Sequence, residues 1–255
     1  MDFLVYPKEK VYFVISLVFS IILYLLLLIS IIGLFYILIG ALIGLILQGL
    51  LIGNLRGNGV RVSEDQFPEV YRIASDLAQK MQMDLPAIYI IQAGGMLNAF
   101  ATKFLGRSFV VIYSDIIELA YEEGEQELAF ILAHELAHLK RKHLTYRMLL
   151  YPSMIIPFLA PAYSRACEYT CDRFGAYYQP KGSAKGLLIL SAGKKLYQRM
   201  NIDRFGRQAL EENGFWVSFT EILGTHPNLP KRVNAVRSFL MNNNYQAEMS
   251  QSVTS

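Results

Sequence analysis

The feature that most constrains this chain is an uncharged, strongly apolar stretch over residues 11–55. As one helix rising ~1.5 Å per residue, it would be roughly 68 Å long, whereas the hydrocarbon core of a bilayer is only about 30 Å thick. Two crossings fit that thickness, and residues 30–33 supply a serine and a glycine for a turn. The sequence therefore predicts a transmembrane hairpin in residues 1–56, with helices over about 11–31 and 34–53.

A cleaved signal peptide is the alternative explanation for an apolar segment near an N-terminus. Its apolar core is about 7–15 residues long and ends at a small-residue cleavage site, neither of which fits here. Lys8 and Lys10 precede the hairpin, and Arg56 and Arg61 follow it, while the turn carries no positive charge. Because positive residues favour the cytoplasmic side, we expect a multi-pass protein of the cell (inner or plasma) membrane whose later residues are cytoplasmic.

The composition excludes several classes of protein. A hydrophobic fraction of 53% with 18% charged residues excludes intrinsic disorder. Two cysteines exclude a disulfide-rich scaffold. A net charge of +3 gives no argument for a nucleic-acid partner.

Residues 57–241 have the pattern of an α+β domain that is mostly helical with a small antiparallel sheet. Glycines at 57–59 suggest a linker, and a helix starting near Pro68 has an apolar stripe through Val70, Ile73 and Leu77. The turn at 105–107 indicates a hairpin. The expected strands are 87–92, 97–104 and 108–113, and the expected further helices are 114–121, 125–147, 164–178, 186–200 and 231–241. We expect the polar tail, 242–255, to fray.

The helix expected over 125–147 carries the pattern His-Glu-x-x-His at positions 134–138. Residues four apart on a helix differ by only ~40° in direction, so His134 and His138 leave one face and can meet one zinc ion. Glu135 then lies close enough to accept a proton from a metal-activated water. The surrounding apolar residues place the motif on a buried helix, where three such side chains without a metal would be costly. The pattern predicts one zinc ion per chain, although these ligand types also accept cobalt or manganese.

A catalytic zinc usually has three protein ligands, and the third must come from elsewhere. On a continuous helix His143 lies ~140° from His138 and faces elsewhere. Arg141 and Leu144 exclude the metzincin pattern, which needs glycine and histidine at these positions.

Glu168 and Asp172 are the best candidates to complete the site. They lie four apart on an expected helix, so one carboxylate can bind zinc while the other orients a histidine. The alternative is that Glu168 and Asp172 are a solvated acidic pair with no role in metal binding. Cys167 and Cys171 are also four apart, but two thiolates would close the site to water and leave Glu135 without a role. We expect both to be small buried hydrophobes.

Four stretches together give the chain a resemblance to the HtpX-like membrane zinc metalloproteases, gluzincins related to the CAAX prenyl proteases. They are Asn98-Ala99-Phe100-Ala101, residues 132–138 with the zinc motif, residues 168–172, and Thr225-His226-Pro227 followed by Arg232.

The resemblance extends from about residue 57 to 237 and implies roles for individual residues. Glu168 is implied as the third zinc ligand and Asp172 as its supporting carboxylate. Residues 98–101 are implied to form an edge strand that pairs with an extended substrate. His226 is implied to stabilise the oxyanion, and Arg232 to steady that region or Glu168.

One departure from the family concerns the apolar stretch 148–163. Many integral members carry two more membrane spans between the motif and the third ligand, and this stretch is too short for two. It fits a re-entrant or surface-seated element, a hydrophobic rim that guides substrate, or plain core packing. The basic residues Lys140, Arg141, Lys142 and His143 before it suit either anionic lipid or a solvated helix end.

Three functions are compatible with these patterns. The first is a membrane-anchored zinc endopeptidase acting on extended polypeptides, in membrane-protein quality control by analogy with the family. The second is a catalytically silent zinc-binding membrane adaptor, which would be expected to have lost Glu135 or a ligand. The third is a prenyl-protein protease, whose chamber of several spans cannot be built from two. The patterns do not give the oligomeric state.

Overall fold

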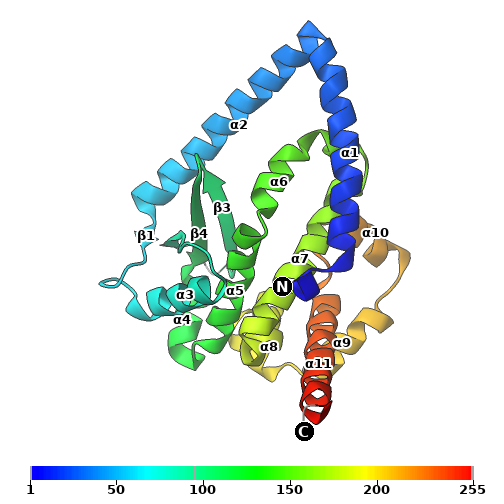
Figure 1. Cartoon of the computed structure of the whole chain (residues 1–255). Helices are drawn as coiled ribbons and strands as arrows, with labels where there is room; N and C mark the ends of the chain where they lie inside the picture. Colours follow the sequence, from blue (N-terminus) through cyan, green and yellow to red (C-terminus); the bar gives the residue numbers. More distant parts are fainter. Residues whose placement is uncertain (1, 93, 95, 254–255) are drawn as a thin grey trace.

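The computed structural model of the chain describes residues 2–92, 94 and 96–253. Two long helices rise from a body of shorter helices and one small sheet and meet at an apex (Figure 1). The helices are η1 (Asp2–Leu4), α1 (Pro7–Ile29), α2 (Ile31–Asn58), α3 (Pro68–Lys80), α4 (Ser114–Glu123), α5 (Gln126–Lys140), α6 (His143–Leu149), η2 (Tyr151–Ile155), α7 (Leu159–Tyr178), α8 (Pro180–Leu196), η3 (Tyr197–Arg199), α9 (Ile202–Glu211), α10 (Phe215–Leu223) and α11 (Leu229–Val253). The strands are β1 (Val60–Arg61), β2 (Ala87–Ile91), β3 (Ala99–Phe104) and β4 (Arg107–Tyr113).

The two N-terminal helices confirm the expected hairpin. Ser30 separates them, and its hydroxyl accepts a hydrogen bond from the Gly33 amide at 3.3 Å, which caps the start of α2. Both helices are long and apolar enough to cross a membrane. Each helix is longer than the sequence indicated. Pro7 is the first helical residue of α1, so this helix begins four residues earlier than expected. Helix α2 continues past residue 53 because no proline interrupts it before Gly59.

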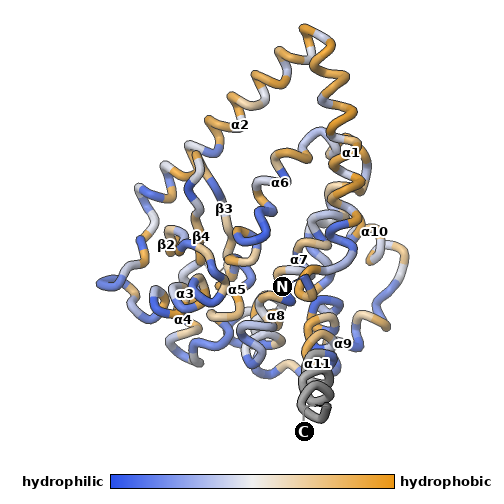
Figure 2. The backbone as a smooth tube through the Cα atoms, in the orientation of Figure 1, coloured by the Kyte–Doolittle hydropathy of each residue, from blue (hydrophilic) through white to orange (hydrophobic). Residues whose placement is uncertain are grey.

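The hairpin is splayed, and its two helices rest on different parts of the body (Figure 1). The first packs against α7 and η2, and the second against β2 and β3. Their surfaces are apolar along nearly their whole length (Figure 2), and most of their large side chains are exposed. A bilayer is the environment that covers such surfaces.

The sheet is mixed, with strand order β1-β2-β4-β3, whereas the sequence led us to expect an antiparallel one. The β3–β4 hairpin is antiparallel as expected and turns at Leu105 and Gly106, both with positive φ. The second strand, however, pairs with β4 in parallel. The chain folds β3 back along the outer side of β4, so β4 rather than β3 lies beside β2. This order leaves β3 at the edge of the sheet.

The motif helix α5 runs through the centre of the body, between the sheet and the pair α7 and α8. Its residues from Glu127 to Ala137 are buried. The Phe130 ring fits between two glycines of the flanking helices, because a Cβ on Gly175 or Gly186 would come within 2.6 Å of it. Close packing at these glycines holds the helix that carries the motif.

The single helix expected over 125–147 is wrong, because it is broken between α5 and α6. Lys142 adopts a left-handed conformation with φ 59°, and His143 starts a helix in a new direction. Neither glycine nor proline marks this break in the sequence. The apolar stretch that follows forms the end of α6, η2 and the start of α7, which begins at Leu159 with Pro161 in its first turn.

The C-terminal region contains more helix than the sequence indicated. Both α9 and α10 lie in a segment for which no element was expected, and α11 runs to Val253 rather than ending at 241. Neither glycine nor proline occurs between Asn242 and Val253, so nothing in the sequence ends that helix. Residues 254 and 255 of the expected tail lie outside the described residues.

Candidate metal centre

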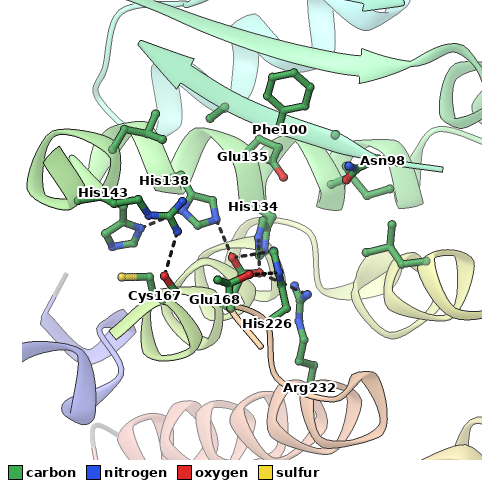
Figure 3. Close-up of a pocket in the computed structure, with 18 of the residues that line it drawn as sticks. Asn98, Phe100, His134, Glu135, His138, His143, Cys167, Glu168, His226 and Arg232 are labelled. Atoms are coloured by element: carbon green, nitrogen blue, oxygen red, sulfur yellow. Dashed lines mark hydrogen bonds and ion pairs between the residues drawn. The ribbon is translucent and has the colours of Figure 1, made fainter. Parts of the chain in front are cut away.

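Three side chains from two neighbouring helices converge on one point. His134 and His138 project from α5, and Glu168 projects from α7 toward them (Figure 3). The Nε2 atom of His134 lies 3.4 Å from one Glu168 carboxylate oxygen, and that of His138 lies 3.3 Å from the other. Two ligands each ~2.0–2.1 Å from a tetrahedral metal are about 3.3–3.4 Å apart. This spacing and the His₂Glu donor set both fit a catalytic zinc.

The electrostatics of these groups also favour a bound cation. Burial alone would lower the pKa of His134, but the carboxylates of Asp172 and Glu168 raise it to about 10. Burial would raise the pKa of Glu168, but His134, His138 and the Arg232 guanidinium hold it well below the usual range. A site that stabilises positive charge on its own histidine also stabilises a divalent ion there.

The ring orientation of His134 is set by a carboxylate behind it. Asp172, one helical turn after Glu168, has Oδ1 3.0 Å from Nδ1 of His134. Arg232 of α11 donates two hydrogen bonds to the same carboxylate, at 2.8 and 2.7 Å. Burial would raise the pKa of Asp172, but the guanidinium lowers it. The anion therefore accepts from Nδ1–H and orients the ring so that Nε2 faces Glu168 and the metal position.

His138 has a different partner on its far side, which the sequence analysis missed. Its Nδ1 lies 3.1 Å from Nδ1 of His143, because the break at Lys142 turns α6 back toward α5. Burial lowers the pKa of His143 to about 4, so its ring is neutral and can accept a hydrogen bond. The expectation that His143 faces elsewhere is wrong, since it assumed a continuous helix.

Glu135 lies on the strand side of the histidines (Figure 3). Burial raises the pKa of its carboxyl, and the backbone amide of Ala101 donates a hydrogen bond to it. A carboxylate with a raised pKa that is held next to a metal position suits a general base.

The strand beside Glu135 offers an open edge. The Tyr113 amide donates to the Asn98 carbonyl at 3.0 Å, and partners alternate along an antiparallel pair. The backbone groups of Ala99 and Ala101 therefore point away from β4. Farther along, the Gln48 side chain of α2 lies 3.4 Å from the Lys103 carbonyl, so the open part of the edge is its start.

His226 reaches the centre from a loop between α10 and α11. Its Nε2 lies 3.5 Å from a Glu168 oxygen, and its Nδ1 lies 3.0 Å from the Thr225 hydroxyl. Its side chain is 64% exposed, unlike the buried motif residues. Arg165 of α7 donates to three carbonyls just before this loop, including that of Gly224 at 2.7 Å, which holds the loop in position.

Among the described residues, two groups that include cysteine also have ligand atoms within 4.8 Å of one another. They are His134 with His138 and Cys171, and Glu9 with His143 and Cys167. Burial raises the pKa of both thiols above the usual range, whereas a metal needs a thiolate. In the second group, Arg141 already donates to Glu9 at 2.8 Å and would compete with a metal ion.

The converging groups line a cavity of about 250 Å³. Its polar wall is formed by the two motif histidines, Glu135, Glu168 and His226, and residues 98–101 form the strand side. Apolar side chains complete it, among them Ile131, Leu144 and Leu190. The cavity therefore brings together every site residue expected from the sequence except Asp172, which lies behind His134.

The chain is similar in sequence to known proteases and similar in fold to a solved structure. A plant protein, the plastoglobule-localized metallopeptidase 48 of Arabidopsis thaliana, is 27% identical over 191 residues, which are 66% of this chain and 54% of the plant protein. A protease HtpX homolog of Thermococcus sibiricus is 26% identical over 232 residues, covering 71% of this chain and 77% of the homolog. The crystal structure of S. mikatae Ste24p superposes with a TM-score of 0.51 at 15% identity, covering 80% of this chain and 58% of that one.

The family model for peptidase family M48 matches residues 64–156 and 148–240. These two matches include strands β2 to β4, the motif helix, the helix with Glu168 and the segment with His226 and Arg232. The chain spans only about half of the plant relative, but the family match extends over most of its own length. This chain is therefore a member of peptidase family M48.

Proposed function

We propose that the chain is a membrane-anchored zinc endopeptidase that hydrolyses peptide bonds of extended polypeptides. The observation that carries the proposal is the convergence of His134, His138 and Glu168, with ligand atoms 3.3–3.4 Å apart and each histidine oriented from behind. A purely structural cluster would not need two imidazoles turned with Nε2 toward the same carboxylate. Family membership supports the same conclusion.

When bound, zinc supplies Lewis acidity, which activates water and polarises the scissile carbonyl. Glu135 accepts the proton of the attacking water at its carboxylate and later passes that proton to the leaving amine. Burial raises the pKa of Glu135, and a higher pKa makes its carboxylate a better acceptor for the proton of the attacking water.

His226 and Arg232 support the reaction from the opposite side of the cavity. The side chain of His226 is exposed, and its Nε2 is within reach of the metal position, where it can donate a hydrogen bond to the oxyanion. Arg232 acts through other residues, because its guanidinium is buried and contacts Glu168 at 3.3 Å and Asp172 at 2.7 Å. It holds both carboxylates in position.

The open edge of β3 supports an extended polypeptide as substrate. Residues 98–101 line the cavity, and backbone groups of Ala99 can pair with a peptide laid antiparallel or parallel beside them. We propose that the natural substrates are membrane proteins subject to quality control, cleaved on the cytoplasmic side. The resemblance to HtpX and the charges flanking the hairpin support that side and that role.

A catalytically silent zinc-binding adaptor is less well supported, because Glu135 and all three ligands are present and converge. A prenyl-protein protease is also less well supported, since the described residues contain two candidate membrane spans and not the several that enclose a prenyl chain.

The decisive experiment is casein cleavage by the detergent-purified, zinc-loaded full chain beside Glu135→Gln. Glu122→Gln, an exposed carboxylate on α4, is the matched control. We expect cleavage by the parent and the control, none by Glu135→Gln, and one zinc per chain in all three by mass spectrometry. Bound zinc without cleavage by the parent would favour the adaptor, and equal cleavage by Glu135→Gln would contradict the mechanism.

A further inference from the structure

Helix α10 has a broad apolar face, formed by Phe215, Trp216, Phe219, Ile222 and Leu223, that the described chain leaves largely exposed. None of its residues is buried, and its sequence, FWVSFTEIL, contains one charged residue. Phe215 and Trp216 are 71% and 72% exposed, and Ile222 and Leu223 at the other end are exposed as well. An exposed apolar face of large aromatic and aliphatic side chains marks a surface that another apolar body covers.

The helix is nevertheless firmly attached at its C-terminal end. The Arg165 guanidinium donates to the carbonyls of Glu221 at 2.8 Å and Ile222 at 2.7 Å, as well as to that of Gly224. The Glu221 carboxylate in turn accepts from the Asn228 amide and pairs with Lys231. These contacts fix where α10 stands relative to α7 and α11, so its exposure is a property of the fold.

Its position coincides with the start of the membrane span. Arg165 also lies close enough to Tyr12 to interact with it electrostatically, and Tyr12 follows Val11, where the uncharged stretch begins. Helix α10 contacts α7, the helix on which α1 also packs, and Figure 1 shows α10 level with the lower part of α1.

A second exposed apolar segment lies against α1. The segment 151–158 contains η2, which packs on α1. Its side chains Met154, Ile155 and Phe158 are exposed, while Ser153 is buried. Exposed apolar groups therefore flank α1 through two different segments of the chain.

We propose that α10 and the segment 151–158 together form a docking surface for the bilayer that the hairpin crosses, with Phe215 and Trp216 inserted at the membrane interface. Tryptophan and phenylalanine on a short helix are typical of interfacial anchors. The bilayer is the occupant that this surface fits, because η2 packs directly on the membrane-spanning α1 and α10 packs on α7, which α1 also contacts.

The charges on α10 determine whether its binding to the bilayer depends on anionic lipid. The helix carries no lysine or arginine, and its one carboxylate, Glu221, is paired with Lys231. Docking therefore depends on apolar insertion and is independent of anionic lipid. Because α10 ends at Gly224, two residues before His226, the bilayer also fixes the position of the His226 loop.

Trp216 is the only tryptophan of the chain, so it reports on α10 without any substitution. The full chain is reconstituted in phosphatidylcholine vesicles containing lipids brominated either near the headgroup or near the chain ends. We expect Trp216 fluorescence to fall at least twofold with the shallow bromines, less with the deep ones, and to be insensitive to aqueous iodide. Adding phosphatidylglycerol is expected to change none of these values.

The matched control moves the tryptophan to the far side of the body. In Trp216→Phe combined with Tyr121→Trp, the lone tryptophan lies on exposed α4, and we expect iodide quenching without bromine quenching. Quenching of Trp216 by iodide but not by brominated lipid overturns the proposal. Protection from both quenchers that disappears on dilution of protein into excess lipid also overturns it, and indicates that a second copy covers α10.

Discussion

His143 Nδ1 lies 3.1 Å from Nδ1 of His138, so the motif histidine is oriented by a residue five positions later in the chain. The contact exists because the helix breaks at Lys142, which has positive φ, so that His143 no longer follows the helical path of α5. On its other side, Nε2 of His143 lies 3.4 Å from the Glu9 carboxylate of α1, which also accepts from Arg141. The first apolar helix is thus connected through one imidazole to His138, a proposed metal ligand.

Replacing His143 should weaken zinc binding although it is not a ligand. His143→Ala removes the acceptor that orients the His138 ring, and loss of such a partner typically reduces metal affinity about 10- to 100-fold. His143→Asn retains a polar acceptor and should lose less. Competition with a chromophoric chelator measures the affinity, and an unchanged value in His143→Ala would contradict the role of this contact.

Replacing Glu9 should affect the metal centre from within the membrane helix. Glu9→Gln leaves the Arg141 guanidinium without its anionic partner and weakens the contact to His143, at a cost of about 1–3 kcal/mol in stability. We expect a lower melting temperature and zinc affinity reduced several-fold. The control is Asp2→Asn, which breaks an exposed ion pair with Lys10 and should change neither quantity. Equal effects of the two variants would argue against the connection.

His226→Ala should reduce turnover while zinc remains bound. Its imidazole contacts Glu168 only at 3.5 Å and is largely exposed, so it contributes little to holding the ligands. Loss of an oxyanion donor lowers kcat by about 10²–10³-fold. Steady-state kinetics with a fluorogenic peptide, together with zinc content, separates the two effects. A loss of zinc equal to the loss of activity would instead make His226 part of the metal site.

Gly182→Ala should destabilise the body of the protein. A Cβ at this position would lie 2.0 Å from the Gln126 carbonyl oxygen, where the start of α8 meets the start of α5. Overpacking of this kind costs about 1–3 kcal/mol. Gly57→Ala, at the end of α2 with no atom within 4 Å of its Cβ, is the control. Thermal unfolding in detergent should show a lower melting temperature for Gly182→Ala only.

Local sequence patterns were sufficient to predict several parts of the structure. The uncharged stretch predicted the hairpin and its turn at Ser30, since length and polarity alone decide what crosses a bilayer. The i, i+4 spacing predicted that His134 and His138 share one face, and the same spacing predicted the relation of Glu168 to Asp172. These are properties of one helix, so they do not depend on how the helices pack.

Contacts between distant segments could be decided only by the tertiary structure. It selects Glu168 to face the two imidazoles and Asp172 to lie behind His134, a choice that the sequence left open until a family resemblance was considered. It breaks the motif helix at Lys142, places β4 beside β2, and leaves the apolar face of α10 largely exposed. In each case the arrangement is stabilised by packing and ion pairs between segments far apart in the chain. Such contacts cannot be predicted from a local sequence pattern.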